Sequence, residues 1–154
     1  MKKIITAAIL SLGFLLCGFS SANGATLTVT KTVDTNDNVC NFDCSLREAI
    51  AFAAPGDTIV FASPLFDSPQ TITLIFGELG IDKNLIINGK GANLTTISAN
   101  NISRVMRIWS GSVTLNGLRL IGGRQALSGS NNGGGIYNSG ILTVSDCAVV
   151  ENSL

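Results

Sequence analysis

Hydrophobic and polar side chains alternate over residues 26–33. Leu27, Val29, Lys31 and Val33 fall on one side of an extended backbone, while the other side carries only threonine. A period of two residues is typical of a strand with one buried face. The pattern therefore predicts a single half-buried β-strand over this segment.

The segment that follows this strand is polar. Asp34, Asn36, Asp37 and Asn38 supply carboxylate and amide oxygens, which are the ligands that calcium prefers. A solvated turn is the favoured interpretation, because the spacing does not match an Asp-rich calcium-binding loop. Calcium binding is the alternative.

The apolar spacing then becomes helical. One helical face gathers four apolar side chains, which are Leu46, Ala49, Ile50 and Ala53. Ser45 and Glu48 form an S-x-x-E capping box, in which each side chain accepts the backbone N–H of the other residue. Pro55 and Gly56 stop the helix. We therefore expect a short amphipathic helix over residues 46–54.

Short strands recur through the rest of the chain. They are predicted over residues 58–61, 71–75, 85–87, 95–98, 105–109, 113–115, 118–121, 135–137, 142–144 and 147–150. Residues 85–89, 113–117 and 142–146 match in composition at offsets of 28 and 29 residues, and residues 118–121 align with residues 147–150. A repeat of about 20 to 30 residues made of short strands indicates a solenoid.

Two or three short strands per repeat fit a parallel β-helix, in which each coil stacks on the next. The alternation assigns ten side chains to the core: Leu85, Ile87, Val113, Leu115, Leu118, Leu120, Leu142, Val144, Cys147 and Val149. Thr114 and Thr143 are expected to point outward, and Ile86 breaks the rule. Cys147 is therefore predicted to be a buried, unpaired thiol.

One turn position repeats from coil to coil. Asn88, Asn116 and Ser145 occupy it in successive repeats. Asparagine tolerates the left-handed backbone that a corner needs, and its amide can bond to the side chain of the next coil. We predict a turn ladder of these three residues, with an ordinary Asn-Gly turn as the alternative.

The first 24 residues have the pattern of a secretory signal peptide. Two lysines precede an apolar run over residues 4–19, and small residues follow it. A run of about 16 apolar residues is short for a membrane span. We expect cleavage after Ala22 or Gly24; lipid attachment at Cys17 is the weaker alternative, because Leu16 stands where a small residue is preferred.

Export changes the interpretation of the cysteines, because disulfides form in oxidising compartments. Cys40 and Cys44 lie four residues apart, directly before the predicted helix. The favoured prediction is a local disulfide between them. A metal site is the alternative, but two thiolates without a nearby histidine make a poor zinc site.

The composition of the chain excludes several classes of function. The 154 residues include 17 Gly, 14 Asn and no His, only 13% are charged, and the net charge is zero, or about −2 without Lys2 and Lys3. A neutral chain is not suited to bind nucleic acid. The lack of histidine excludes Ser-His-Asp and Cys-His catalysis and histidine-ligated metals. We predict no cofactor.

The stretch CSLREAI over residues 44–50 resembles the bacterial family of secreted proteins named for this motif. Cys40, the following residues 55–61 and the Thr-rich first strand also match the usual opening of that family. The resemblance covers residues 26–154 and implies a right-handed parallel β-helix. Residues 133–136 and 149–152 resemble repeats of polymorphic outer-membrane proteins, with Gly135 in place of Ala and Val149 in place of Phe.

These observations divide the chain into a signal peptide (1–24), an N-terminal strand, cysteine loop and capping helix (25–57), and the first coils of an all-β parallel β-helix (58–154). Members of the resembled family are longer, so we expect an N-terminal fragment that stops within a coil and leaves an edge able to self-associate. The localisation expected is secreted or cell-surface, with the outer membrane included, and no membrane span after cleavage.

The expected role is structural, adhesive or glycan-binding. The alternatives are the N-terminal part of a polysaccharide lyase or hydrolase with its site in later coils, and an inactive truncated product. We predict no enzyme, because Asp146 and Glu151 align with glycines one repeat earlier and form no acid–base pair. Four arginines, Arg104, Arg107, Arg119 and Arg124, are expected to form a solvated face.

Overall fold

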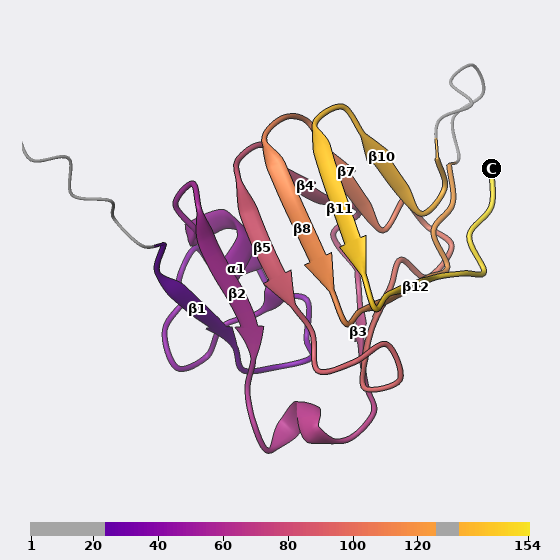
Figure 1. Ribbon diagram of the computed structural model, residues 1–154. Helices are drawn as coiled ribbons and strands as arrows, with labels where there is room; N and C mark the ends of the chain where they lie inside the picture. Colours follow the sequence, from indigo (N-terminus) through magenta and orange to yellow (C-terminus); the bar gives the residue numbers. More distant parts are fainter. Residues whose placement is uncertain (1–23, 126–132) are drawn as a thin grey trace, which may run out of the picture.

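The computed structural model describes residues 24–125 and 133–154, and the chain in these ranges forms a parallel β-helix with one short helix (Figure 1). Except for Gly24, the predicted signal peptide lies outside the described residues. No helix in the described ranges is long and apolar enough to cross a membrane.

Each full coil gives one strand to each of three parallel sheets. The first sheet has the order β1 (Thr26–Val29), β2 (Asp57–Phe61), β5 (Leu85–Asn88), β8 (Ser112–Asn116) and β11 (Ile141–Ser145). The second contains β3 (Gln70–Thr73), β6 (Thr95–Ser98), β9 (Arg119–Ile121) and β12 (Ala148–Val149). The third contains β4 (Leu79–Ile81), β7 (Met106–Ile108) and β10 (Ile136–Asn138). A 3-10 turn, η1 (Leu65–Asp67), lies between β2 and β3.

The repeat predicted from the sequence corresponds to the register between paired strands of successive coils. Val113 pairs with Leu85 in the coil before it and with Leu142 in the coil after it. Leu120 pairs with Val149 in the same way. The two offsets found in the sequence therefore align equivalent positions of successive coils, as predicted.

The core lies inside the coil, where the inward positions of the three sheets meet. Its fully buried members include Ile59, Ile72, Leu79, Leu85, Ile87, Ile97, Met106, Ile108, Val113, Leu115, Leu118 and Leu120. Thr114 is only half-buried and Ile86 is exposed, which agrees with the outward direction given by the alternation. Burial of this apolar surface is the main source of stability.

The prediction of one strand over residues 26–33 is wrong. β1 ends at Val29, and Val33 makes an isolated bridge to Thr73 of β3, so the chain has turned from the first sheet to the second. Thr30 causes the turn: its N–H donates to the Cys44 carbonyl oxygen and its hydroxyl accepts the Cys44 N–H, at 2.9 and 2.8 Å. Val33 is consequently exposed.

Helix α1 (Leu46–Phe52) packs against β1 and β4 at the start of the coil. Leu46, Ala49 and Ile50 are buried in the same core cluster as the strands. The helix and the loop before it therefore cover the N-terminal end of the hydrophobic core (Figure 1). They form the N-terminal cap, residues 30–54, of the β-helix.

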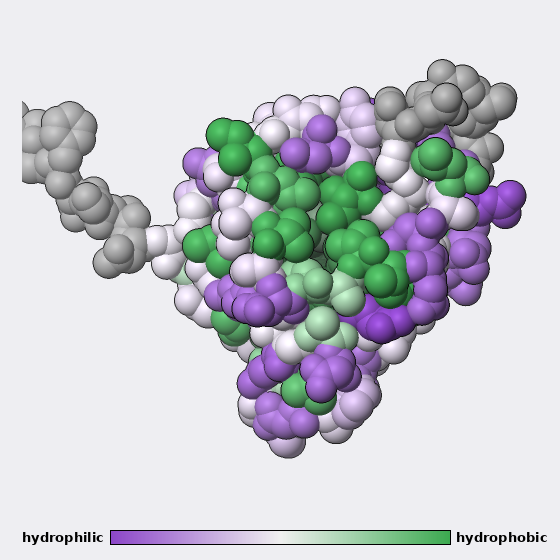
Figure 2. Space-filling view, turned by 45° about the vertical axis from the view of Figure 1, so that its right-hand side comes forward, coloured by the Kyte–Doolittle hydropathy of each residue, from purple (hydrophilic) through white to green (hydrophobic). Residues whose placement is uncertain are grey.

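The last described coil is less buried than predicted. Leu142 and Cys147 are half-buried, while Val144 and Val149 are each 44% exposed. Figure 2 brings this side of the molecule forward and shows hydrophobic residues gathered on it. These four side chains keep the register of the core, but no described coil lies over them. Sequence periodicity gives the direction of a side chain and not what covers it.

Candidate functional site

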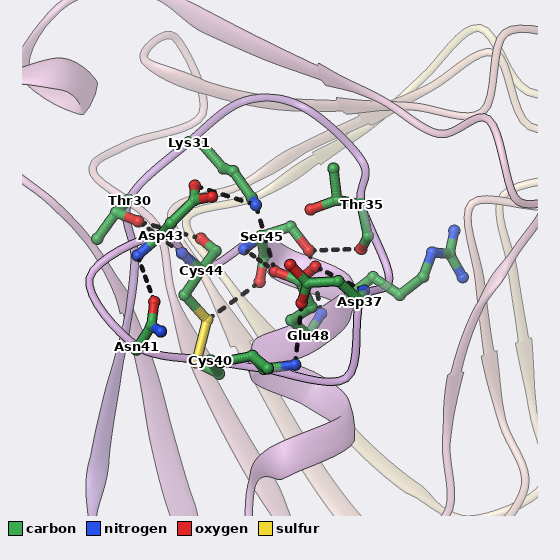
Figure 3. Close-up of polar contacts among 12 residues, drawn as sticks. Thr30, Lys31, Thr35, Asp37, Cys40, Asn41, Asp43, Cys44, Ser45 and Glu48 are labelled. Carbon is green, nitrogen blue, oxygen red and sulfur yellow. Dashed lines mark hydrogen bonds and ion pairs between the residues drawn. A yellow bond between two sulfur atoms is a disulfide. The ribbon is translucent and has the colours of Figure 1, made fainter.

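The cap is closed by the predicted disulfide. Cys40 and Cys44 are joined by an S–S bond, and Cys44 is fully buried (Figure 3). The small loop is ordered further by the Asn41 side chain, which accepts the N–H of Asp43 at 2.9 Å. Cys147, the remaining described cysteine, is free, and partial burial raises the pKa of its thiol.

The predicted capping box is confirmed. The Ser45 hydroxyl accepts the N–H of Glu48 at 3.1 Å, and the Glu48 carboxylate accepts the N–H of Ser45 at 2.8 Å. The helix ends at Phe52, somewhat before the predicted residue 54, because Ala53 leaves helical backbone angles. Both ends of α1 are thus fixed by the residues next to it.

Glu48 does more than cap the helix. Its carboxylate also accepts the N–H of Asp37 at 3.2 Å and lies 3.5 Å from the ammonium of Lys31 (Figure 3). Burial by itself would raise the pKa of Glu48, but the hydrogen bonds from Ser45 and Asp37 favour the ionised form and lower the pKa to about 2. Glu48 is therefore a buried anion that holds the polar loop onto the helix.

Arg47 joins the cap to the first coil. Its guanidinium donates to both carboxylate oxygens of Asp34, at 2.8 and 3.0 Å, and to the carbonyl oxygens of Gly77 and Glu78, at 2.7 and 3.1 Å. These two carbonyls directly precede β4, so one side chain connects α1, the polar loop and the third sheet. A planar guanidinium suits several such bonds at once.

Asp34 is not part of a solvated turn, and the prediction for this residue is wrong. Its side chain is 1% exposed, and one oxygen also accepts the N–H groups of Ile75 and Phe76. Burial opposes ionisation, but Arg47 and these N–H groups together lower the pKa of Asp34. Among the residues that the structure describes, no group of three or more metal-ligating side chains is found.

Every residue of the CSLREAI stretch has a part in building the cap. Cys44 forms the disulfide, Ser45 and Glu48 cap the helix, and Arg47 binds Asp34 and β4. The remaining members, Leu46, Ala49 and Ile50, enter the core. Each residue of the motif thus contributes a contact that folds the cap.

The turn ladder is present in register. Asn88 pairs with Asn116, and Asn116 with Ser145, whose hydroxyl lies 3.2 Å from the Asn116 amide oxygen. The left-handed backbone expected at these residues occurs one position later, at Gly117 (φ 62°) and Asp146 (φ 50°). At these two corners the left-handed residue is therefore the one that follows the ladder position, while Gly89, which follows Asn88, has no positive φ.

One of the four arginines, Arg104, is buried, contrary to the prediction of a solvated face. Arg104 is 8% exposed and Arg107 is half-buried, and both approach Glu78, at 3.2 and 3.7 Å. Arg107 also lies over the Trp109 ring, 3.4 Å from its centroid, and 5.0 Å from the centroid of Tyr137. Alternation along β7 places Arg107 and Trp109 on its outer side, so the third sheet presents a cationic and aromatic face.

A groove of about 420 Å³ lies between α1 and this face. Its lining includes Ile50 and Ala51 of α1, Gly80 of β4, and Trp109. Charged and polar groups at the groove are Asn36, Arg47, Asp82 and Lys83. Sequence reasoning missed the groove because β4 was not predicted: it is short, and Gly80 interrupts its apolar pattern.

The groove is thus the place where polar, charged and aromatic side chains converge, while the cap beside it serves to fix their positions. Comparisons of this chain with models of known protein families, with curated proteins and with solved structures found no match.

Proposed function

We propose that this chain is an exported β-helix module with a structural, adhesive or glycan-binding role outside the cell or at its surface. The observation that carries the proposal is the disulfide-closed cap at one end of the coil. A Cys40–Cys44 bond is suited to an oxidising compartment, which is where a protein with the N-terminal pattern described above would be delivered.

The outer wall of the coil supports the same proposal. Thr26, Thr58, Ile86, Thr114 and Thr143 pair in sequence across the first sheet and form one column of β-branched side chains on its outer side. This column carries no charge and is rich in hydroxyl groups. Such a surface is suited to contact carbohydrate or other cell-surface components, and we propose these, and not nucleic acid, as its partners.

We propose further that this chain does not catalyse a reaction. Four carboxylates along the coil each lie against a cation: Asp67 against Lys90, Glu78 against Arg104, Asp82 against Lys83 and Glu151 against Arg119. Acid–base hydrolysis needs two carboxylates that act on one bond. The carboxylates here are arranged as ion pairs along the wall.

The last described coil supports a proposal about assembly. Among the described strands, none pairs with the outer edge of β11, and apolar side chains lie exposed beside it. Every earlier strand of that sheet is covered by the next coil at the same register. We propose that a second copy of the chain docks against this face, because unpaired edges and exposed apolar groups favour association.

Export and the disulfide are tested together. The full chain is expressed in bacteria and compared with a variant that lacks residues 1–24, and each is located by cell fractionation. We expect the full chain outside the cytoplasm with Cys40 and Cys44 bonded in mass spectra, and the shortened variant inside with free thiols. Free thiols in the exported chain, or retention of the full chain in the cytoplasm, would overturn the proposal.

Adhesion and catalysis need separate assays. Cells that express the full chain should bind a glycan-coated surface more strongly than cells without it, and loss of this difference would contradict the adhesive role. The purified chain is also incubated with polygalacturonate and with alginate. Shortening of either polymer would overturn the non-enzymatic assignment and favour a lyase or hydrolase.

A further inference from the structure

We propose that the groove beside Trp109 binds a neutral oligosaccharide. The inference rests on the proposed function, since it names the ligand class and the site by which the exported module would contact carbohydrate. Three features of the groove support it: an exposed indole, a glycine that leaves space beside the indole, and polar groups that suit sugar hydroxyls.

Trp109 presents a flat apolar surface that is held in place. The residue is 51% exposed, its backbone N–H donates to the Ile81 carbonyl at 2.7 Å, and the Arg107 guanidinium lies over one face of the ring. A large aromatic side chain that is exposed and yet rigid is characteristic of binding surfaces, because little conformational entropy is lost when a ligand stacks on it. The C–H face of a pyranose ring is a suitable partner for such a surface.

Gly80 leaves room beside the indole. A Cβ atom built on Gly80 would lie 3.4 Å from Trp109 Nε1, so the glycine is adjacent to the ring, and its backbone has no positive φ that would itself require glycine. Its register partner on β7 is Arg107. A long side chain at this position would occupy the space in front of Trp109 that the groove now offers.

The charged groups of the groove are largely committed to the protein itself. Arg47 is bonded to Asp34 and two carbonyl groups, and Lys83 Nζ lies 3.0 to 3.5 Å from the Ile50, Ala51 and Ala53 carbonyl oxygens. The Asp82 carboxylate lies 3.9 Å from Lys83 Nζ and remains 73% exposed to solvent.

The remaining polar groups suit hydroxyls. Asp82 can accept hydrogen bonds, and the exposed amide of Asn36 can both donate and accept. Because Arg47 is paired with Asp34 and Lys83 with Asp82, the lining has no net charge with which to attract a polyanionic or a cationic chain. Sugar hydroxyls, which are uncharged and act as donors and acceptors, match this mixed lining.

The chain contains a single tryptophan, so its fluorescence reports on this groove alone. The full exported chain is titrated with three neutral probes, which are cellohexaose, mannohexaose and chitohexaose, with oligogalacturonate as the acidic probe and an extended polar hexapeptide as the peptide probe. We expect a saturable fluorescence change with at least one neutral probe and none with the acidic or peptide probes. No change with any neutral probe, or a change with the acidic or peptide probe alone, would overturn the proposal.

Variants separate the groove from the rest of the molecule. Gly80→Gln keeps the tryptophan but fills the space, and should weaken binding about tenfold or more. Trp109→Ala, measured by calorimetry, should abolish it. Phe42→Ala is the matched control, because Phe42 is an exposed aromatic that does not line the groove, and it should bind as the unaltered chain does. Far-ultraviolet circular dichroism checks that each variant is folded.

The groove and the proposed function can fail separately. If Gly80→Gln binds the neutral probe as tightly as the unaltered chain, the groove is not the site. If cells that carry Trp109→Ala adhere to the glycan-coated surface as well as cells with the unaltered chain, the groove proposal is again wrong while the adhesive role stands. Loss of adhesion with Trp109→Ala but not with Phe42→Ala supports both.

Discussion

Arg47 binds Asp34 through two parallel hydrogen bonds, from Nε to Oδ1 at 2.8 Å and from Nη2 to Oδ2 at 3.0 Å. The side chains are only 14% and 1% exposed. The pair joins the capping helix to the polar loop, and Arg47 extends the connection to the carbonyls before β4. It is therefore one of the points at which the cap and the coil are attached to each other.

Removal of Arg47 should destabilise the protein strongly. Arg47→Met leaves the buried Asp34 carboxylate without its counterion, and we expect the free energy of unfolding to fall by about 3 kcal/mol. Urea denaturation followed by circular dichroism measures the change. Arg119→Met is the control, because its ion pair with Glu151 is solvent-exposed, and it should cost at most about 0.5 kcal/mol. Equal losses for the two variants would contradict the anchoring role of Arg47.

Glu48 should make stability depend on pH in the acidic range. Its pKa is about 2 in the folded chain against 4.5 for the free side chain, so the unfolded chain binds more protons between these values. The resulting stabilisation is complete above about pH 4.5 and is lost as the pH falls through about 2. Between pH 5 and pH 2 the unaltered chain should lose roughly 2 kcal/mol more than Glu48→Gln.

Denaturant titrations of both proteins across this range provide the measurement. Glu151→Gln serves as the control, since its carboxylate is 65% exposed, and its pH profile should follow that of the unaltered chain. Parallel profiles for Glu48→Gln and the unaltered chain would show that the capping carboxylate is not the titrating group.

Much of the fold could be predicted from the sequence. The 28- and 29-residue offsets gave the pairing of Leu85, Val113 and Leu142, because a repeated pattern must stack in register for its apolar face to stay inside. The capping box gave the start of α1, since Ser45 and Glu48 bond within one helical turn. The repeat is a periodic signal and the capping box is a local one, and both can be recognised in the sequence without knowledge of distant contacts.

The site could not be predicted in the same way. Asp34 is buried by contacts with residues 13 and 41 positions away, and no pattern along the chain reveals them. Similarly, Arg107 and Trp109 help to form the groove because they lie next to Gly80 on the neighbouring strand β4. This strand is too short and too irregular to be predicted from the sequence. Contacts between coils that follow no repeated pattern can be identified only from the structure.

Gly89 should be sensitive to a single added methyl group. A Cβ atom at this position would collide with the carbonyl oxygen of Gly117 in the next coil and lie 2.6 Å from Leu118 Cδ2. We expect Gly89→Ala to lower the free energy of unfolding by about 2 kcal/mol or more. Thermal or urea unfolding measures the loss.

Gly80→Ala is the matched control for this prediction, because its Cβ would make only an ordinary contact at 3.4 Å. The effect should be within about 0.5 kcal/mol, and a slight stabilisation is allowed since alanine restricts the unfolded chain. If Gly89→Ala lowers the free energy of unfolding no more than Gly80→Ala does, the coils are less closely stacked at this corner than the structure shows.

The face of the last described coil should mediate self-association. Sedimentation velocity of the full chain should show a species larger than a monomer that disappears on dilution. Val144→Lys places a charge on the exposed apolar face beside β11 and should shift the protein to monomer. Thr71→Lys, on the exposed side of β3, is the control and should associate normally. A monomer at every concentration would contradict the proposal.

The repeating register also fixes the length of the coil in proportion to its number of repeats. Each coil advances the stack by about 4.8 Å, the spacing of hydrogen-bonded strands, without changing the cap from which it starts. A protein of this design sets the distance between its cap and its far end by the number of repeats that it carries. Duplication of one repeat within the gene would lengthen the coil by one such step. The Trp109 groove would keep its position, because it lies beside the cap.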